Sequence, residues 1–226
     1  LHLCDRRQRQ MCIRDRALRF SAMSILNDIK GLFLPPVCPV CGGELHEGEG
    51  AFCMMCRTLA PQTGFWRRAD NPLAERLRNE FPIVQASAFL WFVAGSPWQR
   101  AIHGFKYYNR WRTARDLGAW YGGNLADSGL YGSVDCIVPV PLHTRRLLAR
   151  GYNQAAYIAE GIASRMGVPV EDRAVRRLRN NPSQTTRSSA GRWENVRDLF
   201  AVARPGALAG RHVLLVDDVV TTGSTL

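Results

Sequence analysis

The apolar and polar positions of this chain alternate between helix-like and strand-like segments. Apolar side chains recur near helical spacing in residues 23–34, 71–81, 97–108, 111–125 and 150–167. Short apolar runs bounded by polar or turn residues predict strands at residues 84–92, 135–141 and 212–218. Buried strands that alternate with helices are typical of an α/β domain. We therefore expect a mostly parallel sheet with helices on both faces.

Short-range signals predict where several of these helices begin and end. Pro35 and Pro36 come directly after the first helical segment and should stop it. Ser96 followed by Pro97 has the form of an N-cap and a first-turn proline. Gly167 stands where the last long helix should end.

Length and composition limit the class of protein. The 226 residues are enough for one domain of ordinary size and a small additional module. Hydrophobic residues make up 46% of the chain and charged residues 22%, as in a water-soluble globular protein. No apolar run reaches membrane-spanning length, and no secretory signal is recognisable. We therefore expect a cytoplasmic protein without a membrane span.

The net charge of +11 is concentrated in part at the start of the chain. Residues 1–20 carry six arginines against two aspartates, without helical periodicity or a cap. Met23 is a plausible first residue of the native protein, so we expect residues 1–22 to be a non-native or disordered leader. The remaining positive charge is compatible with an anionic ligand or with a nucleic acid, and it does not choose between them.

Four of the seven cysteines form two Cys-x-x-Cys turns, CPVC and CMMC, separated by eleven residues that include four glycines. Two such turns on a glycine-bearing hairpin can direct four thiolates at one tetrahedral ion. We expect a structural zinc site with the ligands Cys38, Cys41, Cys53 and Cys56. The alternatives are disulfides, which a reducing cytosol disfavours, and a redox pair, which needs only one turn.

The last fourteen residues, VLLVDDVVTTGSTL, place two aspartates directly after a predicted strand and before a loop of small hydroxyl residues. In open parallel sheets, ligands bind beyond the carboxyl ends of the strands. Backbone N–H groups around Gly223 can converge on a phosphate, and carboxylates can accept hydrogen bonds from sugar hydroxyls. The pattern suits a sugar phosphate, whereas the alternative of a strand end before a capped helix leaves the aspartate pair unexplained.

The segment VLLVDDVVTTGST resembles the phosphoribosyl-pyrophosphate motif of type I phosphoribosyltransferases. The paired cysteine turns, FKYYNRW and VPVPLHTRRLLARGYNQA occur in the order that is typical of the ComF/GntX family. The resemblance covers about residues 23–226. It implies a Rossmann-like parallel sheet in residues 63–226, preceded by a short helix and a zinc ribbon in residues 23–62. Because family members continue beyond this loop, we expect the domain to be truncated at its carboxyl end.

The resemblance also implies roles for individual residues. Asp217 and Asp218 would contact the ribose hydroxyls, directly and through water bound to Mg²⁺. The 5′-phosphate would be held by Thr221, Thr222, Gly223, Ser224 and Thr225. Candidates for the pyrophosphate and for a lid over the site are Arg145, Arg146, Arg150, Asn153, Gln184, Arg192, Asn195 and Lys106.

Each of these assignments has a plainer alternative. The arginines after VPVP can form a solvated basic helix face, and Asn153 can serve only as a helix cap. Lys106 can be an exposed helical lysine. Arg187 departs from the family, where leucine is usual, which puts the packing of the lid in question.

Two functions are implied by the resemblance. The first is binding of phosphoribosyl pyrophosphate with Mg²⁺ and transfer of the phosphoribosyl group to an acceptor that the residues do not identify. The second is a non-catalytic role in DNA uptake, in which the protein binds single-stranded DNA or a partner protein. A role in gluconate use is associated with the family by name alone. The sequence leaves the oligomeric state open.

Overall fold

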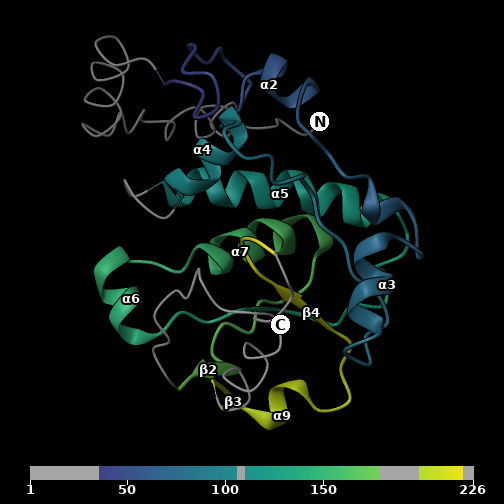
Figure 1. Cartoon of the computed structure of the whole chain (residues 1–226). Coiled ribbons are helices and arrows are strands. Elements are labelled where there is room, and N and C mark those ends of the chain that lie inside the picture. The colour runs from purple at the N-terminus through teal and green to yellow at the C-terminus, as the bar shows by residue number, and fades with distance from the viewer. Residues whose placement is uncertain (1–35, 106–109, 179–198, 221–226) are drawn as a thin grey trace, which may run out of the picture. The chain divides into compact units, whose positions relative to one another are not determined.

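The computed structural model describes residues 36–105, 110–178 and 199–220 (Figure 1). The predicted leader and the predicted helix at residues 23–34 lie outside these ranges.

Two parallel strands run side by side at the centre of the described domain. Strand β1 (Cys136–Pro139) pairs with β4 (Val213–Val216), in a register that places Pro139 opposite Val216. All four residues of β1 are buried. Ile137 also forms a parallel bridge with Val170 on the other side of β1. The two strands confirm the predictions for residues 135–141 and 212–218 and the prediction of a parallel sheet.

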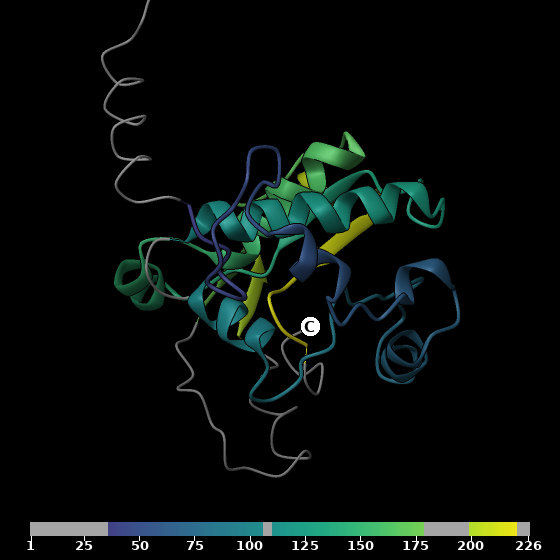
Figure 2. The same ribbon diagram turned by 90° about the horizontal axis from the view of Figure 1, so that it is seen from above.

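Two long helices pack in layers over this strand pair. Helix α7 (Gln154–Met166) packs against β1 and β4, and α5 (Trp111–Asp127) packs along α7 (Figure 1). Seen from above, α5 lies over α7 (Figure 2). Both helices were expected, although α7 begins at Gln154 rather than at Arg150. Asn153 sets this start, because its side chain accepts a hydrogen bond from the backbone N–H of Ala155 at 3.2 Å.

Glycines let α5 and α7 approach closely. A Cβ atom added at Gly118 would lie 2.2 Å from the carbonyl oxygen of Ile158. One added at Gly161 would lie 2.0 Å from the carbonyl oxygen of Arg115. Any larger residue at these positions would push the helices apart, so the hydrogen side chain of glycine sets the distance between them.

Shorter helices also begin where the sequence predicts. Helix α3 (Pro72–Arg78) is capped by Asn71, and α4 (Pro97–Gly104) is capped by Ser96, whose Oγ accepts from the N–H of Gln99 at 3.1 Å. Gly167 ends α7 with a φ of 72°. The other short elements are α2 (Met54–Thr58), η1 (Phe65–Arg67), α6 (Thr144–Arg150), α9 (Pro205–Leu208), and the antiparallel pair β2 (Val175–Arg177) and β3 (Phe200–Val202).

The strand predicted at residues 84–92 is wrong. The segment contains no strand. It pairs with another backbone segment only at an isolated bridge between Gln62 and Leu90 and at the backbone hydrogen bonds next to that bridge. Its apolar residues instead line a cavity of about 960 Å³, which β4 also borders. An apolar run becomes a strand only where a second backbone segment lies close enough to pair with it. Among the described residues, such a segment is available here only around Gln62.

Among the described residues, no helix combines the length and the apolar character needed to cross a membrane.

The contact between α5 and α7 yields a test of stability. We expect Gly161→Ala to lower the free energy of unfolding by about 1–3 kcal/mol, because its methyl group has no space against α5. Gly123→Ala is the matched control, because Gly123 lies in α5 with no atom within 4 Å of its added Cβ. Gly123→Ala should raise stability by up to about 1 kcal/mol through helix propensity. Urea unfolding measures both changes, and equal effects would contradict the role given to Gly161.

Candidate functional site

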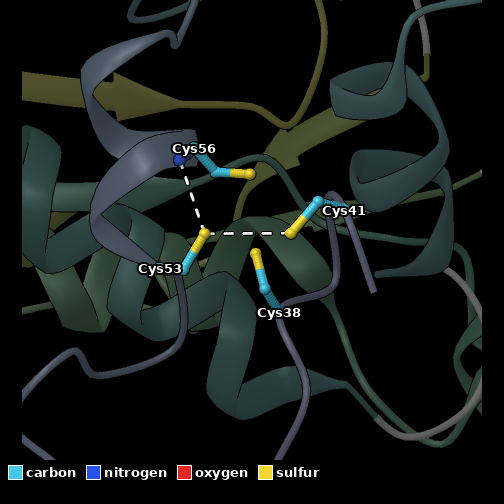
Figure 3. Close-up of side chains that lie close together, drawn as sticks. All are labelled: Cys38, Cys41, Cys53 and Cys56. Carbon is cyan, nitrogen blue, oxygen red and sulfur yellow. Dashed lines mark hydrogen bonds between the residues drawn. The ribbon is translucent and has the colours of Figure 1, made fainter. Parts of the chain in front are cut away.

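The four cysteines of the two predicted turns come together in the structure. Figure 3 shows their sulfur atoms turned toward one another, and all four lie within 4.8 Å of each other. The sulfur atoms of Cys41 and Cys53 are 3.8 Å apart. A tetrahedral zinc ion with Zn–S bonds of about 2.3 Å spaces its sulfur ligands by about 3.8 Å. The cluster therefore has the donor type and spacing to hold a metal such as zinc.

Backbone hydrogen bonds shape both cysteine turns. The N–H of Gly42 donates to the carbonyl of Cys38 at 2.8 Å, and Gly42 takes a φ of 77° that other residues rarely adopt. In the second turn, the N–H of Cys56 points at the sulfur of Cys53 at 3.4 Å, where Cys53 caps α2. In the first turn, the N–H of Gly43 points at the sulfur of Cys41, also at 3.4 Å. N–H groups directed at sulfur favour the thiolate, which is the form that binds a metal.

The acidity of the thiols differs across the cluster. Burial raises the pKa of Cys38, but hydrogen bonds from nearby backbone N–H groups outweigh it and lower the pKa to about 7. Burial and the neighbouring thiols raise the pKa of Cys56. Concentrating four such sulfurs therefore suppresses ionisation of some of them, and a bound cation would offset that repulsion.

Aromatic side chains join the ribbon to the rest of the described domain. Phe52, between the two cysteine turns, has its ring centroid 5.2 Å from that of Trp98 in α4 and 6.4 Å from that of Trp120 in α5. Cys38 and Cys56 belong to the same buried apolar cluster as these helices. The ribbon thus shares a core with α4 and α5. The proposed domain boundary at residue 63 stays a prediction.

The predicted aspartate pair lies at the carboxyl end of β4. Asp217 and Asp218 are half-buried, and the N–H of Asp218 donates to Oδ1 of Asp217 at 2.8 Å. Both residues border the cavity of about 960 Å³. The parallel register continues past the strands, because the N–H of Val140 donates to the carbonyl of Val216 at 2.8 Å. The turn after β1 therefore begins beside Asp217.

That turn leads into α6, the helix that carries the predicted arginines. His143 caps α6, and its Nδ1 accepts from the N–H of Arg145 at 3.2 Å. Arg145 is exposed, whereas Arg146 and Arg150 are half-buried. Arg145 thus matches the alternative of a solvated face, whereas Arg146 and Arg150 are partly shielded from solvent.

A buried glutamine that we did not single out from the sequence holds Arg150. Gln154 is 2% exposed, and its Oε1 accepts from Nη1 of Arg150 at 3.2 Å. Its Nε2 has no hydrogen-bond partner among the described residues. Asn153, beside it, caps α7 and donates from Nδ2 to the carbonyl of Val140 at 3.0 Å. Asn153 therefore does more than cap a helix, because it also holds the turn after β1.

Several predicted site residues lie outside the described residues. They are Lys106, Gln184, Arg192, Asn195, Thr221, Thr222, Gly223, Ser224 and Thr225. Their roles stay predictions from the sequence.

Comparisons with known proteins identify the family. Residues 153–226 match the phosphoribosyl transferase domain. Competence protein F of Haemophilus influenzae is 37% identical over 199 residues, which is 84% of this chain and 86% of that protein. The chain belongs to the ComF family. Two proteins named DNA utilization protein YhgH also match this ComF-family chain. The one from Escherichia coli K12 is 29% identical over 205 residues, and the one from Salmonella typhimurium is 37% identical over 210 residues. Each alignment covers 86% of this chain and 89% of the relative.

No solved structure matches this ComF-family chain. The predicted family and fold class are nevertheless confirmed. The chain has a phosphoribosyltransferase domain with parallel strands, preceded by a four-cysteine cluster consistent with a zinc ribbon.

The cysteine cluster can be tested by metal analysis. We expect the purified protein to carry about one equivalent of a thiol-preferring divalent metal such as zinc, and removal by a chelator to lower its melting temperature. Cys56→Ser should lose the metal, because three thiolates remain. Cys136→Ser is the control, since Cys136 is buried in β1, away from the cluster. A full metal content in Cys56→Ser would contradict the assignment.

Proposed function

We propose that this ComF-family protein binds phosphoribosyl pyrophosphate together with Mg²⁺ at the carboxyl ends of β1 and β4. One observation supports this most strongly: the parallel register sets the aspartate pair beside the turn that leads into α6, the helix that carries Arg146. Acceptors for sugar hydroxyls and donors for phosphate oxygens thus lie at one edge of the sheet. The phosphoribosyl transferase domain match over residues 153–226 includes the aspartate pair.

The aspartate pair receives the ribose. Ionised carboxylates only accept hydrogen bonds, so Asp217 and Asp218 suit the two ring hydroxyls, which donate. The hydrogen bond from the N–H of Asp218 to Oδ1 of Asp217 holds the first carboxylate in place before the ligand arrives. The 5′-phosphate goes to the loop at residues 221–225, an assignment that rests on the sequence motif.

The turn after β1 receives the diphosphate. Arg146 and Arg150 are half-buried, and guanidinium groups form paired hydrogen bonds to phosphate oxygens. Gln154 fixes the position of Arg150 through the bond at 3.2 Å. A fixed guanidinium loses less side-chain entropy when it binds an anion. Mg²⁺, when bound with the ligand, supplies positive charge to the diphosphate.

Transfer requires little proton chemistry from the protein. A nitrogen nucleophile forms a bond to the anomeric carbon of the ribose, the bond from that carbon to the pyrophosphate oxygen breaks, and pyrophosphate leaves with the electron pair. The nucleophile then releases its proton to solvent. The carboxylates orient the ribose, and the arginines stabilise the negative charge that grows on the leaving group. The acceptor is not specified by any described residue.

The metal of the ribbon has a structural role in this proposal. Four cysteine ligands complete the coordination of Zn²⁺ and leave no open position for catalysis. The bound ion stabilises a ribbon whose core is shared with α4 and α5 through Phe52.

Ligand binding tests the proposal directly. Calorimetric titration of phosphoribosyl pyrophosphate with Mg²⁺ should show saturable binding, which the double substitution Asp217→Asn/Asp218→Asn weakens by about 100-fold or more. That size is expected from the loss of two charged hydrogen bonds at about 1.5–3 kcal/mol each. Asp172→Asn is the control, because Asp172 is an exposed aspartate outside the site.

The controls decide how a negative result is interpreted. All three proteins should have similar melting temperatures, since the asparagine side chains nearly match the aspartates in shape. Equal binding by the parent and the double variant would show that the carboxylates do not hold the ribose. Absence of binding to the parent would reject the proposed ligand.

A second candidate function is DNA binding. Relatives carry the names DNA utilization protein and competence protein, and this chain has a net charge of +11. In this alternative, basic residues contact the phosphates of single-stranded DNA or the protein binds a partner in DNA uptake, and the ligand site is not catalytic.

Salt dependence separates the two candidates. If the protein binds single-stranded DNA through its phosphates, the affinity should fall by at least about tenfold between 50 and 200 mM salt. Fluorescence anisotropy with a labelled oligonucleotide measures this. Asp217→Asn/Asp218→Asn should leave the DNA affinity equal or slightly higher. DNA binding that is insensitive to salt would contradict the phosphate-contact model.

A further inference from the structure

Arginines gather at one end of the described domain. Helix α6 and the first turns of α5 lie at this end in Figure 1 and in Figure 2. The two segments, residues 110–117 and 143–151, hold the arginines Arg110, Arg112, Arg115, Arg145, Arg146 and Arg150. Their only acidic residue is Asp116, and Asp217 and Asp218 lie at the nearby sheet edge. Six positive charges therefore stand against three negative ones, and this end attracts anions.

An aromatic contact joins the two segments. The ring centroid of Tyr157, in α7, lies 5.1 Å from that of Trp111, the first residue of α5. The same ring lies 5.7 Å from that of Tyr152, which comes two residues after α6 ends. The start of α5 and the end of α6 thus meet on α7.

The arginines of α5 differ from those assigned to the diphosphate. Arg112 and Arg115 are exposed, whereas Arg146 and Arg150 are half-buried. Arg112 and Arg115 are three residues apart in α5, so their side chains are neighbours on the helix surface. An anion too large to enter a pocket can therefore contact the α5 pair.

The exposed arginines stand next to aromatic rings. The guanidinium carbon of Arg112 lies 4.9 Å from the ring centroid of Trp111. This contact restricts the orientation of the guanidinium, whose N–H groups can still bond to phosphate oxygens. Trp111 and Tyr157 are half-buried, so part of each ring is open to solvent. Such rings offer a stacking surface to an unpaired base.

Arginines combined with partly open rings fit a single-stranded nucleic acid. A single strand presents phosphates together with bases whose faces are accessible. A duplex presents phosphates at higher charge density but keeps the faces of its bases stacked inside. It would use the arginines and leave the rings without a role.

We propose that the surface formed by Arg112, Arg115, Trp111 and Tyr157 binds single-stranded DNA, with the arginines on its phosphates and the rings on its bases. This inference rests on the second candidate function, DNA binding, and it specifies where the strand lies. It also separates the DNA surface from the arginines of α6. The plainer alternative is a solvated basic helix face, for which only the loss of net charge would matter.

Anisotropy measurements with a labelled oligothymidylate of about 20 nucleotides test the surface. Arg112→Gln/Arg115→Gln should weaken binding by about tenfold or more at 50 mM salt. It should also make the plot of log affinity against log salt less steep by about 1.4, because each phosphate contact to a single strand contributes about 0.7. The matched control, Arg173→Gln/Arg176→Gln, removes the same charge from two exposed arginines outside the surface. The control should keep the slope of the parent.

A duplex of the same length tests the role of the rings. Arginines alone would bind the duplex at least as tightly as the single strand, because its phosphates are denser. We expect the parent to bind the single strand more tightly, by about tenfold. Equal or tighter binding of the duplex would overturn the assignment to a single strand.

The outcomes separate this inference from the proposed functions. All variants should melt with the parent, because the substituted side chains are exposed. If the parent binds the oligonucleotide and the α5 variant behaves as the control does, the surface is wrong while DNA binding stands. If the parent does not bind it, the inference and the second candidate function are both rejected. The α5 variant should bind phosphoribosyl pyrophosphate with Mg²⁺ as the parent does, and a loss there would overturn the separate surface.

Discussion

The parallel pairing of β1 with β4 is the constraint on which the candidate ligand site depends. Parallel strands end at the same edge of the sheet. The residues that directly follow them are therefore neighbours, whether or not their side chains interact. The bond from Val140 to Val216 carries the pairing one residue beyond the strands, to the point where Asp217 begins. The aspartate pair of one segment and the turn that leads to the arginines of α6 then lie at the same edge of the sheet. Neither segment has this chemistry alone.

The helices hold this pair of strands in place, and the contact between α5 and α7 leaves no space for larger side chains. Helix α7 lies on both strands, and α5 lies on α7 at a distance set by Gly118 and Gly161. Because α7 also begins at the site, its position has a second consequence. Asn153 bonds to the turn after β1, and Gln154 bonds to Arg150. The packing of one helix thus helps to position the turn after β1 and Arg150, which the proposed function uses.

The two candidate sites of the protein are built in different ways. The cysteine cluster is local: two short turns separated by eleven residues bring its four sulfurs together, and backbone N–H groups point at two of these sulfurs. The candidate ligand site is assembled from segments distant in the chain, which the pairing of β1 with β4 brings together. Phe52 connects the two regions, because it packs the ribbon against Trp98 and Trp120 of the helices. Loss of metal would therefore destabilise the core as well as the ribbon.

The sequence by itself determined the features that depend on near neighbours in the chain. Cysteine spacing predicted the cluster, and cap residues such as Ser96 predicted helix ends, because these interactions span only a few residues. It also determined the alternation of helices and strands and the place of the aspartate pair. Tertiary structure decided the rest. It left residues 84–92 without a strand partner and brought the aspartate pair at the end of β4 beside the turn after β1. Strand pairing and the proximity of charged residues depend on which distant segments the fold places together. A local sequence pattern does not determine this.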